Sequence, residues 1–179
     1  MSNRPEYAEN FPFLSISEFE VAAAAVIPRL QRSGVACTFS HKDNASVEFV
    51  VWRDVDHYTV RTRAQILLSP TYSLPTLYFV STLTDNLTSS TTIISLLEDV
   101  YKYIIPSTAS AVLEQAGIYG ASAISQGEIP NTHMLGFYVH PCQTGDVMNI
   151  VNQDRRISLD DYLVVWFGVF GGILGVGLL

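Results

Sequence analysis

The stretch HYTVRTRAQILL, residues 57–68, decides the fold class because apolar and polar side chains alternate along it. A period of two places the two sets on opposite faces of a β-strand. One set is largely apolar and the other is polar: Tyr58, Val60, Thr62, Ala64 and Ile66 against His57, Thr59, Arg61, Arg63 and Gln65. The pattern predicts a half-buried strand, with one face on a core and the other in solvent.

The segments around this strand predict an antiparallel sheet. ASVEFVVW (45–52) and TLYFVSTL (76–83) are rich in β-branched and aromatic residues, and the turn-forming SPTYSLP (69–75) precedes the second of them. Connections this short favour an antiparallel meander. After the expected loop SQGEIPNTH (125–133), the apolar stretch MLGFYVHP (134–141) predicts one further strand or extended segment.

Helical patterns surround the predicted strands. SEFE, from Ser17 to Glu20, has the spacing of a capping box, and the apolar residues after it recur with helical period. Four helices are expected: about 17–32, one through TTIISLLEDVYKYI (91–104) with Ser89 or Ser90 as its cap, a short one through SAVLEQA (110–116), and one opening at Ser158. We therefore expect a single α+β domain over residues 1–179, in which an antiparallel sheet of about four strands is flanked by helices.

Composition narrows the functional classes. The 179 residues are 48% apolar and 15% charged, which suits a domain with a sizeable core. The net charge is −7 and no basic run occurs, so no nucleic acid partner is expected. The sequence has neither a phosphate-binding glycine loop nor a metal-ligand spacing of Cys or His, so we expect no cofactor and no metal. Two isolated cysteines without a signal-peptide pattern indicate a reducing compartment, the cytosol or the nucleus.

The two cysteines, Cys37 and Cys142, lie in different contexts. Cys37 is expected to be a small buried hydrophobe, as most lone cysteines are. Cys142 follows His140 and Pro141 at the end of a predicted strand, where the proline stiffens the backbone. In an extended segment the His140 and Cys142 side chains would project to the same side, and a nearby imidazole favours a thiolate. Cys142 is therefore a candidate nucleophile, with an inert cysteine as the alternative.

The last segment of the chain raises a different functional class, a membrane-anchored interaction protein. Residues 162–179 are 18 positions without a charge, which is the lower limit for spanning a bilayer, and their glycines satisfy the GxxxG spacing. No basic residue flanks this segment, as membrane anchors usually require. A core helix with a glycine-rich end is the interpretation that we favour.

Several segments together resemble a known family. HPCQT (140–144) is similar to the catalytic motif of the autophagy-related protein ten family of ubiquitin-like-conjugating enzymes. SQGEIP lies nine residues before HPC and resembles the family's Gln-x-Glu-His-Pro loop, with Ile129 in place of the histidine. PTYSLPTLYF resembles the family's central strand and YLVVWFGVFGGILG its hydrophobic terminal helix, with weaker support from FPFLS near the start. The sister family, autophagy-related protein three, shares His-Pro-Cys but normally carries a long acidic insertion, for which this chain has no room.

The resemblance implies a ubiquitin-conjugating-like fold and an acyl transfer in two steps. Cys142 would accept the C-terminal glycine of the ubiquitin-like autophagy-related protein twelve from its activating enzyme, autophagy-related protein seven. It would then pass the acyl group to a lysine of autophagy-related protein five, in the cytoplasm and with at most transient membrane contact. We also predict that TLYFVST (76–82), expected near a sheet edge, helps with the Tyr72 turn to dock this acceptor directly, because an edge strand can pair with a strand of a partner.

Transfer to a lysine also needs a hydrogen-bond donor for the oxyanion that forms on the thioester carbonyl. Ordinary ubiquitin-conjugating enzymes have an Asn after His-Pro, whereas here the cysteine itself takes that position. The candidate donors are Asn131 in the loop before the cysteine and Tyr72 in the SPTYSLP turn, with Gln126, Gln143 and Asn149 as further amides. The resemblance implies that His140 and Pro141 mainly brace the backbone.

Overall fold

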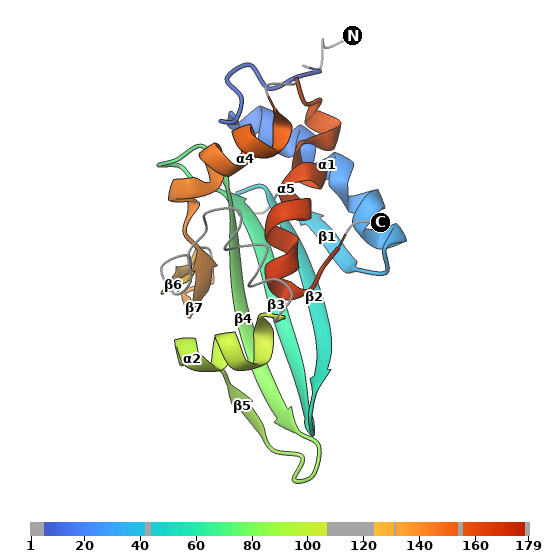
Figure 1. Ribbon diagram of the computed structural model, residues 1–179, viewed down its shortest axis with the longest axis vertical. Helices are drawn as coiled ribbons and strands as arrows, with labels where there is room; N and C mark the ends of the chain where they lie inside the picture. Colours follow the sequence, from blue (N-terminus) through green and yellow to red (C-terminus); the bar gives the residue numbers. More distant parts are fainter. Residues whose placement is uncertain (1–5, 42–43, 107–123, 131, 154–155, 178–179) are drawn as a thin grey trace.

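A computed structural model of the chain shows an antiparallel sheet of seven strands with helices packed against one of its faces (Figure 1). It describes residues 6–41, 44–106, 124–130, 132–153 and 156–177. Within these residues the strand order is β1-β2-β3-β4-β7-β6, and the short β5 pairs with β4 beyond the end of β7. The strand bounds are β1 Ala36–Ser40, β2 Ser46–Val55, β3 Tyr58–Leu68, β4 Pro75–Asp85, β5 Thr91–Ile93, β6 Ile124–Ile129 and β7 Met134–Val139.

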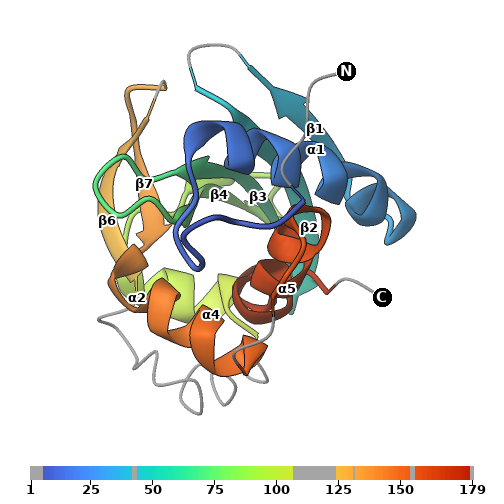
Figure 2. The same cartoon turned by 90° about the horizontal axis from the view of Figure 1, so that it is seen from above.

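Most of the helical segments gather toward one end of the sheet, opposite the β4–β5 hairpin, whereas the helical segment of residues 97–104 lies near β5 (Figure 1). The helical segments are α1 Ile16–Arg32, α2 Leu97–Asp99, the π-helical turn η1 Val100–Ile104, the 3₁₀ turn η3 Pro141–Gln143, α4 Thr144–Asn152, α5 Leu159–Phe170 and the 3₁₀ turn η4 Gly171–Leu174. Viewed from above, α1 crosses over the end of the sheet, and α4 and α5 lie together beside it (Figure 2). This end of the molecule therefore brings together the start, the middle and the end of the chain.

The core forms between the sheet and the apolar faces of α1 and α5. The alternation predicted for β3 is confirmed, because Val60, Ala64 and Ile66 are buried while Arg61 and Arg63 are exposed. Phe167 of α5 packs against Phe49 of β2 with ring centroids 5.6 Å apart. Burial of such aromatic side chains supplies most of the driving force for this packing.

The last apolar segment belongs to this core. Tyr162, Leu163, Trp166, Phe167 and Phe170 are each at most 1% exposed. None of the described helices is both long enough and apolar enough to cross a bilayer. The expected core helix, with Ser158 as its N-cap, is confirmed, since the Ser158 hydroxyl accepts the backbone N–H of Asp161.

Several sequence expectations need correction. The capping box of α1 is Ser15 with Glu18, because the same S-x-x-E spacing occurs two residues earlier than Ser17. The segment 91–104 is not one helix: its first residues pair with β4 as β5, and helical structure begins only at Leu97. SQGEI (125–129), expected to be part of a loop, lies in strand β6, because all six residues of β6 pair with β7. The helix expected at 110–116 lies outside the described residues.

Candidate active site

The turn that carries Cys142 is a helix start and not an extended strand end. Strand β7 ends at Val139, His140 is the N-cap residue, and Pro141 is the first residue of η3. Proline is favoured at the first position of a helix because the N–H group of that residue has no partner within the helix. The absence of this group in proline therefore costs no hydrogen bond. Helix α4 follows directly, so the expectation that His140 and Cys142 project to one side of an extended chain is wrong.

His140 supports the backbone of Cys142. Its Nδ1 accepts the backbone N–H of Cys142 at 3.2 Å, so this nitrogen carries no proton in the observed arrangement. The first N–H groups of a helix have no partner within the helix, and this hydrogen bond provides a partner for one of them. His140 thereby holds the peptide on which the thiol stands.

Cys142 itself is exposed, and so is Gln143, whereas the residues on either side of this pair are buried. Pro141 and Thr144 point into the protein, whereas Cys142 and Gln143 face solvent. The thiol therefore stands on the surface, while Pro141 and Thr144 anchor the turn in the protein. The thiol is therefore accessible from solvent.

Tyr72 lies next to this turn although it comes from the connection between β3 and β4. Its ring approaches that of His140 edge-on, with centroids 5.5 Å apart, and it is 38% exposed. The connection is a compact turn in which Ser69 accepts the N–H of Tyr72 through its side chain and that of Ser73 through its carbonyl. The structure thus brings Tyr72 beside the His-Pro-Cys motif.

The other proposed oxyanion donors are placed differently. Asn131 lies outside the described residues. Gln126 lies on β6, where its amide donates to the carbonyl of Ser95 at 3.2 Å. Gln143 and Asn149 are exposed on η3 and α4, the segment that also carries Cys142.

Ile129 has a packing role at the position where a histidine was expected. It is buried at the end of β6, above Gly136 of β7. A Cβ atom at Gly136 would come within 2.5 Å of the Ile129 side chain and 2.8 Å of the Phe79 carbonyl oxygen. The glycine and the isoleucine therefore fill one space between β4 and β6.

The N-terminal segment around Pro12 and Leu14 packs beneath the site and forms its floor. The sequence did not predict this contact. The N–H of Leu14 donates to the carbonyl of Ser73, in the same turn as Tyr72. Pro12 lies 3.4 Å from the position of a Cβ atom at Gly145, in the first turn of α4. This segment thus connects the Tyr72 turn to the helix that carries Cys142.

Glu18 ties the N-terminal segment to α1. Its carboxylate accepts the backbone N–H groups of Glu9 and Ser15 and the Ser15 hydroxyl, each at 2.7 Å. Burial alone would raise the pKa of Glu18, but these hydrogen bonds outweigh it and lower the pKa. The signal that could have identified this contact is the S-x-x-E pattern at Ser15.

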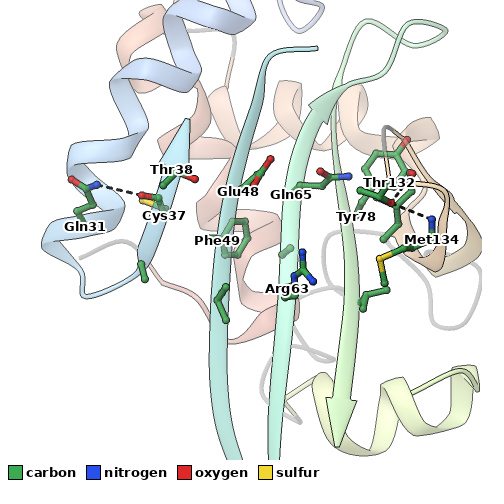
Figure 3. A pocket seen from close by; sticks show the side chains of 15 residues that line it. Gln31, Cys37, Thr38, Glu48, Phe49, Arg63, Gln65, Tyr78, Thr132 and Met134 are labelled. Carbon is green, nitrogen blue, oxygen red and sulfur yellow. Dashed lines mark hydrogen bonds between the residues drawn. The ribbon is translucent and has the colours of Figure 1, made fainter. Parts of the chain in front are cut away.

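A separate groove lies on the uncovered face of the sheet. It has a volume of about 620 Å³ and is bordered by Gln31, Glu48, Arg63, Tyr78 and Met134 (Figure 3). Of the predicted catalytic residues that the structure describes, Cys142 and Tyr72, neither lines this groove. Strand β4 does not offer the free edge that was expected for acceptor docking, because it pairs with β3 on one side and with β7 and β5 on the other.

A comparison with known protein families identifies the family of this chain. The matched residues include the whole site except its N-terminal floor. Residues 26–178 match the family described as "Autophagocytosis associated protein, active-site domain". The chain belongs to this family. The expected resemblance is thereby confirmed, and the His140-Pro141-Cys142 turn, the Tyr72 turn and α4 all lie inside the family's active-site domain.

The chain is also similar to one curated relative and to one solved structure. The ubiquitin-like-conjugating enzyme ATG10 of Gibberella zeae is 34% identical over 112 residues, which are 63% of this chain and 43% of that protein. The structure titled "Solution structures of KmAtg10" covers 93% of this chain and 98% of its own, with a TM-score of 0.55 and 14% identity. This likeness confirms the α+β fold, although the sheet has seven strands where about four were expected.

Proposed function

We propose that this chain is a ubiquitin-like-conjugating enzyme of autophagy with Cys142 as its thioester-forming nucleophile. The observation that carries the proposal is the exposed thiol at a helix start, whose peptide N–H is held by His140. Such an arrangement suits a sulfur that must meet large protein partners in turn. By family resemblance the donor is autophagy-related protein twelve, delivered by autophagy-related protein seven in the cytoplasm.

The first step exchanges one thioester for another. The Cys142 thiolate attacks the carbonyl carbon of the activating enzyme's thioester, a new S–C bond forms, and the thiolate of the activating enzyme leaves. No oxidant and no metal is needed, and ATP is consumed in the preceding activation step. A thiolate is a strong nucleophile even when only a small fraction of the thiol is ionised at neutral pH.

The second step forms an isopeptide bond with a lysine of the acceptor, autophagy-related protein five. The amine attacks the same carbonyl, a C–N bond forms, the Cys142 thiolate leaves, and the amine loses a proton. A transient oxyanion develops on the carbonyl, and a fixed hydrogen-bond donor stabilises it by about 3 kcal/mol. Tyr72 supports this role through its place beside His140, and Asn131 is the second proposed donor.

His140 and Pro141 serve as positioning residues in this proposal. His140 accepts the Cys142 N–H and so keeps the thiol facing outward, and Pro141 anchors the turn in the core. The Tyr72 turn borders the same site, and we propose that the acceptor docks on this side.

The test is reconstitution with the activating enzyme, ATP and the ubiquitin-like protein. Wild type forms an adduct that a reductant cleaves, Cys142→Ser forms at most a reductant-resistant ester, and Cys142→Ala forms none. Cys37→Ala is the matched control, since it removes the other thiol of the chain. An adduct that persists in Cys142→Ala, or that is lost in Cys37→Ala, would show that the nucleophile is misassigned.

A further inference from the structure

The cysteine turn and the Tyr72 turn belong to two strands that meet at a short junction. Strand β7 leads into the cysteine turn, β4 follows the Tyr72 turn, and within the described residues the two strands pair at two positions. On the helix-covered face the rings of Phe79 and Phe137 stack with centroids 5.8 Å apart. On the open face the ring centroids of Tyr78 and Tyr138 lie 5.5 Å apart. This junction therefore sets where one turn stands relative to the other.

Tyr138 connects the junction to the residue that supports Cys142. Side chains two positions apart on an extended chain point to the same face, so Tyr138 and His140 leave β7 on the same side. Their ring centroids lie 6.1 Å apart, with the planes tilted by 37°. His140 thus has two aromatic neighbours, Tyr138 and Tyr72, both within the usual distance of aromatic pairs. Each neighbour restricts the orientations that the imidazole can adopt.

His140 supports Cys142 in only one orientation of its ring. Its Nδ1 accepts the Cys142 N–H at 3.2 Å, near the long end of the usual range. A half-turn of the imidazole would place the carbon Cδ2 where Nδ1 lies, and the hydrogen bond would be lost. Because the ring is only half-buried, its orientation depends on the side chains beside it.

Gly127 of β6 provides the space in which the Tyr138 ring lies. A Cβ atom at Gly127 would come within 3.1 Å of Cε1 and 3.7 Å of Cδ1 of Tyr138. The first distance is shorter than an ordinary van der Waals contact, so a methyl group there would push the ring aside. Strand β7 lies between β4 and β6, so the Tyr138 ring is held by Tyr78 from one neighbouring strand and by the Gly127 backbone from the other.

We propose that Tyr138 is a positioning residue for the thioester chemistry of Cys142. It holds the His140 imidazole in the orientation that accepts the Cys142 N–H, and Tyr78 and Gly127 hold Tyr138 in turn. The inference rests on the proposed function, because it concerns the rates at which Cys142 gains and loses its acyl group. Tyr138 acts through His140 and not on the sulfur itself.

The first experiment compares variants of Tyr138 that remove or keep the ring. Tyr138→Leu removes it, Tyr138→Phe keeps it, and Tyr58→Leu is the control, since Tyr58 is also a half-buried strand tyrosine, paired with Tyr103 at 5.6 Å. We expect Tyr138→Leu to slow both loading and single-turnover discharge to free lysine by about tenfold, because the thiol is less well oriented. The KM for the conjugating enzyme in loading should not change. Tyr138→Phe and Tyr58→Leu should behave as wild type.

A double-mutant cycle tests whether the effect passes through His140. If it does, Tyr138→Leu causes no further loss of rate when it is added to His140→Ala. Losses that multiply in the double variant, or wild-type rates in Tyr138→Leu alone, would overturn the inference and leave the proposed function intact.

Hydrogen exchange of the Cys142 amide, followed by NMR, tests the positioning without any partner protein. Loss of the His140 bond should speed this exchange by about fivefold or more in Tyr138→Leu. Gly127→Ala should have a smaller effect in the same direction while every side chain of the site is kept, and Tyr58→Leu should have none. An unchanged exchange rate in Tyr138→Leu and Gly127→Ala would overturn the inference. If wild type forms no adduct on Cys142, the proposed function fails, and this measurement still decides whether Tyr138 orients the imidazole.

Discussion

The two cysteines of the chain show how surroundings decide what a thiol can do. Cys37 is 7% exposed on β1, where its Sγ lies 3.7 Å from the carbonyl oxygen of Ile27 in α1 and donates to it. Cys142 is exposed at the start of α4, with its backbone held by His140. Burial raises the pKa of the Cys37 thiol, which keeps it neutral and unreactive.

The two regions also differ in how they are built. Cys37 faces Phe49 across the β1–β2 pair and is covered by the helix that directly precedes its strand. The surroundings of Cys142 come from three distant parts of the chain: the N-terminal segment, the Tyr72 turn and the β7–α4 connection. A buried cysteine needs only local packing, whereas the exposed one depends on long-range contacts for its neighbours.

The largest expected difference is in the reaction of the two thiols with an alkylating reagent. Cys142 should react within seconds to minutes, while Cys37 reacts only when the fold opens. With a typical stability of 5 kcal/mol or more, this protects Cys37 by roughly a thousandfold or more. Mass spectrometry of tryptic peptides over time measures both rates, and comparable rates in the folded protein would contradict the assigned burial.

The next effect concerns the proposed oxyanion donors beside Cys142. Removing the true donor, in Tyr72→Phe or Asn131→Ala, should slow discharge to lysine by about a hundredfold and leave loading nearly unchanged. Loading and single-turnover discharge are measured separately for each variant. A parallel loss of loading would mean that the residue holds the turn in place, and normal discharge in both variants would place the donor elsewhere.

A smaller effect is expected at Glu18, which holds the N-terminal floor of the Cys142 region. Its folded pKa is lowered, so its stabilising contribution is present above the unfolded pKa of about 4.3 and is lost as the pH falls through the folded value. Glu18→Gln should lower the free energy of unfolding at pH 7 by about 1–2 kcal/mol. Urea unfolding between pH 7 and pH 3 tests this, and the variant should depend less steeply on pH; equal slopes would contradict the prediction.

The smallest effect belongs to Cys37. Its folded pKa is raised, so the stability that it contributes is complete below the unfolded pKa of about 8.5 and declines as the pH rises toward the folded value. The free energy of unfolding of wild type should therefore fall between pH 8 and 9.5, and Cys37→Ala should lack this part of the decline. The same dependence in both proteins would assign it to other groups.

Local sequence patterns predicted the central elements of the fold. Strands β2, β3 and β4 carry β-branched and alternating residues over ten or eleven positions, and α1 and α5 have clear caps and apolar faces. Elements that carry weak local signals were missed. Strand β6 contains Gly127 and ends before Pro130, both typical of loops, and it is a strand because it pairs with β7.

The sequence by itself determined which thiol to examine, and the family resemblance implied that His140 and Pro141 brace its turn, although an extended strand end and not a helix start was expected there. Pro141 suits the first position of a helix, and the imidazole of His140 can accept the backbone N–H of Cys142 two residues later. Both features are local, since they involve only three consecutive residues. The burial of Cys37 follows in the same way from its place in a short apolar segment.

Only the tertiary structure decided what surrounds that turn. Tyr72 meets His140, and the N-terminal segment meets the Tyr72 turn, because the sheet and α1 bring these distant segments to one end of the molecule. No local pattern encodes such contacts. The pattern of each helix or strand is compatible with many arrangements of the elements, and only the packing of the whole chain selects one of them.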